Sequence, residues 1–248
     1  MEDLEKVFWK KVRRYVSILR IVPFLRMVAV CNNLAFGKVD AKSDIDLFIV
    51  AKKGHLFTVR IFVTVLLQLM GVRRHGDKVS GRFCLSFFVD DSALDLSPIA
   101  IEDDVYLAFW IMTMKPVIDD GVFGEFLNRN DWALKYFAEA CHVNLQPCTE
   151  YCLPESPFLK FFCGFLEFVF SGRFGNWVES IMRRWQLKRA RTKASNAGCD
   201  ADLLINDHVL KFHNVDRRRF YRDQWFVRYG ESAKLTSDEF LSIIGDGE

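Results

Sequence analysis

The sequence predicts an α/β fold of the α+β kind, with a small mixed sheet and helices followed by a helical C-terminal domain. Two observations support this fold class. Three short apolar runs typical of buried strands lie at 27–31, 44–50 and 83–89, and helical patterns lie between them. Beyond about residue 120 the strand patterns fade and helical spacing dominates. We therefore expect two domains, 1–120 and 121–248.

The first half alternates helical and extended segments. An amphipathic helix is predicted over 4–19, because apolar residues recur there mostly at steps of three or four and Pro23 follows. The apolar run 27–31 is followed by Asn32 and Asn33, which predicts a buried strand that ends in a polar turn. The other expected elements are a loop at 34–42, strands at 44–50, 83–89 and 116–118, and helices at 55–70 and 102–113.

The second half is expected to be mainly helical. One segment, 209–213, has the alternation of an extended strand. The helices predicted here lie at 123–127, 132–140, 157–170, 176–189 and 216–228.

Composition excludes several classes of protein. The chain has 248 residues, of which 50% are hydrophobic and 27% charged, so it is neither a disordered nor a collagen-like chain. The longest apolar run, 56–72, is interrupted by Arg60 and Gln68, and we expect no transmembrane span. Seven cysteines, an odd number, and a charged N-terminus predict a reducing, cytoplasmic location.

The most informative residues are two carboxylates at the start of the second predicted strand. Strand side chains alternate between faces, so Asp44 and Asp46 point the same way and Ile45 and Leu47 point to the other face. Two neighbouring carboxylates repel unless a cation or donor lies between them. Mg²⁺ is bound by one or two carboxylates together with water and substrate phosphate, so the pair is a candidate metal site.

The segment Ser43-Asp44-Ile45-Asp46-Leu47 resembles the polymerase-β-like nucleotidyltransferase superfamily, in particular its minimal bacterial members. Gly37 matches a common loop glycine of that superfamily, and the loop length fits. The resemblance is clear over 25–50 and extends to about 120. It implies a nucleotidyltransferase-like domain over 1–120. It also implies Mg²⁺-dependent transfer of a nucleoside monophosphate from an NTP to an acceptor hydroxyl, with release of pyrophosphate.

The resemblance also implies site roles. Asp44 and Asp46 would bind two Mg²⁺ ions, and Asn32, Asn33, Gly37 and Ser43 would bind the nucleotide. Asn32 and Asn33 replace the Gly-Ser turn of the superfamily. The third carboxylate is not clear either, because the polar positions of 83–89 are Cys84 and Ser86. We choose Asp95, which lies between two leucines, as the third metal ligand and possible base.

Two alternatives remain open. The chain could be a non-catalytic nucleotide- or RNA-binding relative, or a regulatory partner in a two-component module. The acceptor could be a small molecule, a protein or RNA, and the sequence does not distinguish them.

Two basic segments, 183–193 and 217–228, interleave Lys and Arg with aromatic residues. This pattern suits contact with nucleic acid. We favour a solvated basic face over an aromatic core, and contact with an anionic membrane has the least support. His75, which lies in the basic loop Arg73-Arg74-His75, could meet a triphosphate, although a solvated loop is the simpler interpretation.

Overall fold

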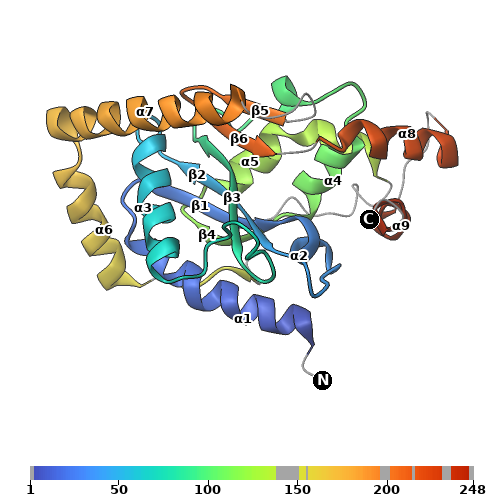
Figure 1. Cartoon of the computed structure of the whole chain (residues 1–248), viewed down its shortest axis with the longest axis horizontal. Helices are drawn as coiled ribbons and strands as arrows, with labels where there is room; N and C mark the ends of the chain where they lie inside the picture. Colours follow the sequence, from blue (N-terminus) through green and yellow to red (C-terminus); the bar gives the residue numbers. More distant parts are fainter. Residues whose placement is uncertain are drawn as a thin grey trace.

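The computed structural model describes residues 3–137, 151–154, 156–195, 202–213, 216–230 and 236–245. Its centre is one six-stranded mixed sheet with the order β4-β1-β2-β3-β6-β5 (Figure 1). The strands are β1 (Leu25–Cys31), β2 (Ile45–Ala51), β3 (Phe83–Asp90), β4 (Lys115–Asp119), β5 (Asp202–Ile205) and β6 (Val209–His213). The mixed α/β class is therefore confirmed.

One parallel pair lies at the middle of the sheet. Strand β2 pairs parallel with β3, and every other neighbouring pair is antiparallel. In register, Asp46 of β2 lies beside Cys31 of β1 on one side and beside Cys84 of β3 on the other. The C-terminal end of β1 and the N-terminal ends of β2 and β3 therefore meet at the same end of the sheet.

Helices cover both faces of the sheet. The face that carries Ile45, Leu47 and Ile49 packs against α1 (Leu4–Val16) and α3 (Leu56–Leu69). The opposite face, with Phe48 and Val50, belongs to a buried cluster that also contains residues of four helices. These are α4 (Val105–Thr113), α5 (Phe123–Arg129), α8 (Arg218–Tyr229) and α9 (Ser237–Gly245). The predicted alternation of side chains along β2 is confirmed, because the two sets belong to separate clusters of buried residues.

The other helical elements connect these layers. They are α2 (Asn32–Phe36), α6 (Pro157–Val169) and α7 (Gly172–Ser195), with short 3₁₀ turns η1 (Ser17–Ile21), η2 (Ser97–Ile99) and η3 (Asp131–Tyr136). Helix α2 occupies part of the expected loop at 34–42, and the expected helix at 132–140 is η3 over its first residues, while 138–140 lie outside the described residues. No helix of the described part of the chain is long and apolar enough to cross a membrane.

The C-terminal half is not only helical. Strands β5 and β6 extend the sheet beside β3, and Phe240 of α9 packs on the same core as Phe109 of α4. Among the described residues, segments on both sides of residue 120, the expected domain boundary, therefore share one sheet and the same buried core. The physical reason is that β3 would otherwise present an unpaired edge, which β6 covers with backbone hydrogen bonds.

Candidate functional site

The candidate site lies at the end of the sheet where β1 finishes and β2 begins. Asp46 is the second residue of β2, and its side chain projects to the face covered by α4. Nδ2 of Asn32 donates a hydrogen bond to Oδ2 of Asp46 at 2.9 Å. The hydroxyl of Tyr106 in α4 donates to Oδ1 of the same asparagine at 3.3 Å. Asn32 therefore links the carboxylate to a helix of the covering layer.

Asp44 and Asp46 lie together with Cys84 of β3. One ligand atom of each residue lies within 4.8 Å of the corresponding atoms of the other two. Cys84 takes this place because it pairs in register with Asp46 across the parallel β2–β3 ladder. The neighbouring strand thus offers a thiol at the position where the resemblance implies a third carboxylate.

Arg74 supplies positive charge to this cluster. Its Nη1 donates to Oδ2 of Asp44 at 2.6 Å, and it also lies 3.9 Å from the Sγ of Cys84. The arginine is placed there by backbone pairing, since its N–H donates to the carbonyl of Phe83 at the start of β3. The basic loop that contains Arg74 therefore reaches the carboxylates through its arginine.

Burial and like charge dominate the electrostatics. Burial, together with the charge of Asp44, raises the pKa of Asp46 to about 6, although the Asn32 hydrogen bond and Arg74 oppose the shift. Burial and the charge of Asp46 raise the pKa of the Cys84 thiol well above its usual value. The pKa of the Cys31 thiol is raised for the same two reasons. At neutral pH the Asp46 carboxylate therefore lies beside two neutral thiols, because its pKa of about 6 lies below that pH and the thiol pKa values are raised.

The residues expected to bind the nucleotide have distinct places. Asn32 adopts a left-handed backbone with a φ of +57° and opens α2, and Asn33 accepts a backbone hydrogen bond from Lys38 through its carbonyl. Gly37 ends α2 with a φ of +71°, which glycine adopts without strain. The hydroxyl of Ser43 is buried and donates to Asp40 at 2.7 Å, so it orders the loop before Asp44.

Asp95 does not join the carboxylate pair. It follows the C-terminal end of β3, whereas Asp44 and Asp46 lie at the N-terminal end of the parallel strand β2. Its carboxylate is exposed and accepts the backbone N–H of Ser97 at 2.8 Å. Among the described residues, the group that could hold a metal ion consists of Asp44, Asp46 and Cys84. Parallel strands place matching residues at the same end of a sheet, so a residue that follows β3 lies at the other end.

The basic segment 217–228 approaches the site through its aromatic residues. Tyr106 stacks on Tyr221 of α8 with ring centroids 4.9 Å apart. The buried guanidinium of Arg218 is bonded to Asp216 and Asp104, and Arg222 is bonded to Asp223. Two of the arginines that could meet nucleic acid are thus engaged within the protein.

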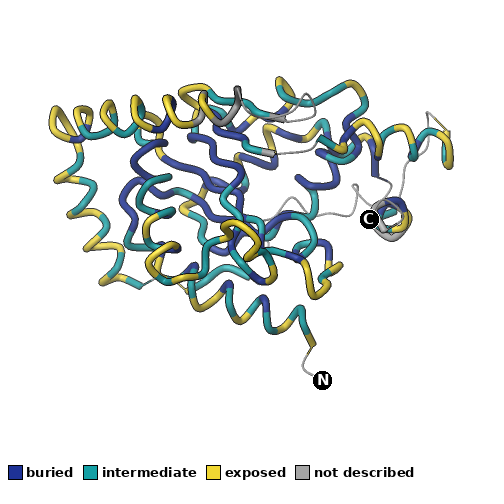
Figure 2. The backbone as a smooth tube through the Cα atoms, viewed as in Figure 1, coloured by how far each residue is buried: buried dark blue, intermediate teal, exposed yellow. Residues whose placement is uncertain are grey.

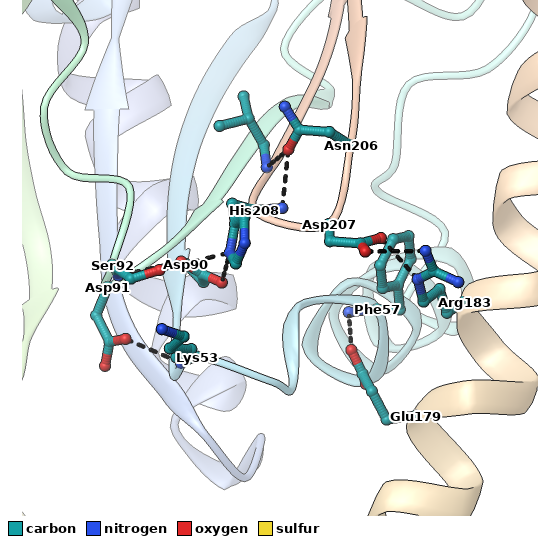
Figure 3. Close-up of polar contacts among 11 residues, drawn as sticks. Lys53, Phe57, Asp90, Asp91, Ser92, Glu179, Arg183, Asn206, Asp207 and His208 are labelled. Atoms are coloured by element: carbon teal, nitrogen blue, oxygen red, sulfur yellow. Dashed lines mark hydrogen bonds and ion pairs between the residues drawn. The ribbon is translucent and has the colours of Figure 1, made fainter.

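A second polar cluster lies at the opposite end of β3 (Figure 3). The buried carboxylate of Asp90 accepts from the hydroxyl of Ser92 at 2.6 Å and lies 2.8 Å from Nδ1 of His208. Ser92 and Asp90 both face the same ring nitrogen of His208, so the three do not form a relay from hydroxyl through imidazole to carboxylate. These contacts link the β5–β6 turn to the C-terminal end of β3.

The donor set fits one hard divalent cation better than two. The carboxylates of Asp44 and Asp46 are the oxygen ligands that Mg²⁺ prefers. A cation between them would offset the burial and the repulsion by Asp44 that together raise the pKa of Asp46. A thiol is a poor Mg²⁺ ligand. A second ion would lack the third carboxylate within the described residues.

Sequence reasoning missed the roles of Arg74 and Tyr106. The only signal for Arg74 was the basic loop before β3, and nothing in the local pattern of α4 singles out Tyr106.

Comparison of the chain with protein-family models, with curated proteins and with solved structures finds no match.

Proposed function

We propose that the protein is a Mg²⁺-dependent nucleotidyltransferase that moves a nucleoside monophosphate from an NTP to an acceptor hydroxyl and releases pyrophosphate. The main support for the proposal is that Asp44 and Asp46 lie close together at the N-terminal end of the buried strand β2. Burial and the charge of Asp44 raise the pKa of Asp46. Perturbed carboxylates at such a place are typical of metal–phosphate chemistry.

The chain's own residues would bind and orient the substrate. Asp44 and Asp46 would hold the metal, which when bound neutralises the charge of the triphosphate. Arg74 would move from Asp44 to a phosphate oxygen, since a guanidinium binds either anion. Asn32 would keep the Asp46 carboxylate aimed at the site through its 2.9 Å hydrogen bond. The stacked rings of Tyr106 and Tyr221 would lie beside the position where the acceptor hydroxyl binds.

The proposed partners are an NTP and an acceptor that is a small molecule, a protein or RNA, in a cytoplasmic setting. RNA would approach over 217–228, because Tyr221 stacks on Tyr106, whose hydroxyl donates to Asn32.

The test compares NTP binding with and without Mg²⁺ in the wild type and in the Asp44→Asn/Asp46→Asn double variant. We expect binding that depends on Mg²⁺ and weakens at least about a hundredfold in the variant, because two charge-assisted ligands are lost. Asp95→Asn is the matched control, an exposed acid outside the cluster, and should bind as the wild type does. Equal binding by the wild type and the double variant would place the nucleotide elsewhere.

A second candidate is a metal-dependent NTP-binding protein that does not transfer the nucleotide. Cys84 favours it, because the neighbouring strand carries a thiol where a third carboxylate would hold a second ion.

The variant Cys84→Asp distinguishes the two candidates. If the wild type releases pyrophosphate from an NTP, the first candidate holds. If the wild type binds NTP without turnover and Cys84→Asp gains pyrophosphate release, the second holds and the missing carboxylate is the cause. Cys84→Ser is the matched control, since it replaces the thiol without adding a charge.

A further inference from the structure

We propose that α6 and residues 172–189 of α7 form a docking surface that binds peripherally to an anionic phospholipid bilayer. The surface consists of exposed apolar side chains on these two helices, and we call it the outer apolar surface. Its members are Phe158, Phe161, Phe162, Phe165, Phe168 and Val169 of α6, and Phe174, Trp177, Ile181 and Trp185 of α7. Figure 2 shows α6 exposed or half-buried along its whole length.

Helix α6 is amphipathic, but its apolar face is exposed and its polar face contacts the protein, which is the reverse of an ordinary surface helix. Its apolar residues repeat at the spacing of one helix face, yet that face points to solvent: Phe161 is 77% exposed and Phe168 80%. The face that contacts the body of the protein carries Cys163 and Glu167. Glu167 accepts from the backbone N–H of Phe24 at 2.8 Å and from Arg26 at 3.3 Å. The helix is therefore fixed to the body by its polar side.

Helix α7 is fixed in the same way. Glu179 accepts from the backbone N–H groups of Phe57 and Thr58 at 2.9 and 2.8 Å, and Arg183 is bonded to Asp207 at 2.6 Å (Figure 3). At the helical spacing of 100° per residue, Phe174, Trp177, Ile181 and Trp185 fall on the side away from Glu179. Phe174 contacts both Phe170 and Trp177, so the aromatic residues continue through the α6–α7 turn.

The charge of this region is complementary to an anionic surface. The segment 157–195 contains two acids, Glu167 and Glu179, and both are turned to the body. Arg173, Arg184, Lys188 and Arg189 are exposed. Arg184 and Lys188 also line an open groove of about 390 Å³ with Arg183, Leu187 and Thr192. An apolar face of Phe and Trp flanked by Lys and Arg is the arrangement of helices that lie in a membrane interface, where the cations meet lipid phosphates.

Nucleic acid explains this surface less well. The apolar stripe of α6 runs over three turns of helix with no cation among its members, whereas bases stack on aromatic residues that alternate with cations. Exposed apolar areas of this kind on a protein surface mark sites of interaction.

Docking would leave the carboxylate pair uncovered. Glu167 binds Phe24, next to the start of β1, whereas Asp46 pairs with Cys31 at the end of that strand. Six residue steps along a strand separate the two ends by about 20 Å. Membrane binding and nucleotide binding are therefore independent properties, and each can be tested without the other.

The experiment is co-sedimentation of the full chain with vesicles of phosphatidylcholine alone and of phosphatidylcholine mixed with phosphatidylglycerol. We expect binding to the mixed vesicles that weakens with salt, and much weaker binding to phosphatidylcholine alone. The triple variant Phe161→Ser/Phe165→Ser/Phe168→Ser should lose at least about tenfold in partitioning, because each exposed ring would otherwise leave water. Arg184→Gln/Lys188→Gln should lose mainly the preference for anionic lipid.

The matched control is Leu69→Ser/Val227→Ser, which removes two side chains that are 80% and 83% exposed elsewhere on the molecule. The control should bind vesicles as the wild type does, and all variants should keep the thermal transition of the wild type because the changed residues are exposed. Absence of wild-type binding to the mixed vesicles would overturn the proposal. Vesicle binding that the triple variant retains would also overturn it. So would a wild type that binds RNA but not vesicles. A wild-type dimer that does not bind vesicles, and that only the triple variant dissociates, would overturn it as well.

Discussion

Nη1 of Arg74 lies 2.6 Å from Oδ2 of Asp44, so a guanidinium already occupies one side of the carboxylate pair. The pair therefore has a cation partner before any metal binds, and the approach of Mg²⁺ brings two positive charges together. A phosphate oxygen attracts both the metal and the guanidinium, so an anionic ligand would offset their mutual repulsion. Under the proposed function, Arg74 would therefore couple metal binding to nucleotide binding.

Arg74→Gln should consequently change two affinities in opposite directions. We expect tighter binding of Mg²⁺ alone, by several-fold, because a competing positive charge is removed. Binding of Mg²⁺ with NTP should weaken by about tenfold, because a phosphate ligand is lost. Calorimetric titration of the metal alone and of the nucleotide at saturating metal measures both. Arg73→Gln, the neighbouring change, is the control, and parallel shifts in both affinities would contradict the coupling.

Metal binding should depend on pH through Asp46. Burial and the charge of Asp44 raise its pKa to about 6, so protons compete with the cation below that value. The apparent affinity for Mg²⁺ should be constant above about pH 7 and fall about tenfold for each unit below about pH 6. A titration series across this range measures the midpoint. A midpoint near pH 4 would show that the carboxyl behaves as an ordinary exposed aspartate.

The same shift affects the stability of the metal-free protein. The folded state holds the Asp46 proton more tightly than the unfolded chain, whose aspartate has its usual pKa of 3.8, so stability falls as the pH rises through about 6. Asp46→Asn removes this penalty, and at neutral pH it should raise the free energy of unfolding by about 1–2 kcal/mol. Chemical denaturation at neutral and acidic pH checks the sign, and a variant that is less stable at both pH values would contradict it.

Asn32 combines a backbone role with a side-chain role, and two variants separate them. Its φ of +57° suits glycine, so Asn32→Gly should keep the turn, whereas Asn32→Ala should cost about 1–2 kcal/mol of stability. Both remove the donor to Asp46, so both should raise its pKa and move the pH midpoint of metal binding upward. Thermal melts and the pH series together measure the two effects, and an unchanged midpoint would rule out the hydrogen bond as an influence on Asp46.

Glu179 caps a helix that is far away in the sequence. Its carboxylate accepts from two backbone N–H groups at the first turn of α3 and from the Thr58 hydroxyl at 2.5 Å, where the N-cap residue His55 supplies no side-chain bond. Glu179→Ala should lower the free energy of unfolding by about 1–3 kcal/mol. Glu179→Gln, which keeps one acceptor, should lose less. Urea denaturation measures both, and equal losses would show that the acceptor is not what stabilises the contact.

Local pattern predicted strands β1, β2, β3, β4 and β6 and most helices, but it did not predict β5, α2 or α9. The apolar runs at 27–31, 44–50 and 83–89 are β1, β2 and β3 within one or two residues, because a strand buried on both faces needs continuous apolar side chains. The period of two along β2 also predicted that Asp46 and Ile45 point to different faces, and the two clusters of buried residues confirm it for the strand. These are properties of neighbouring residues, which the sequence contains directly.

Pairing between distant segments decided the rest. Parallel register between β2 and β3 places Cys84 beside Asp46 and leaves Asp95 at the other end of the sheet, and no local pattern specifies that register. Strand β6 joins the sheet because the edge of β3 needs backbone partners, although more than a hundred residues separate the two strands. The outward face of α6 was equally out of reach, since helical spacing shows that a face is apolar but not whether the body of the protein covers it.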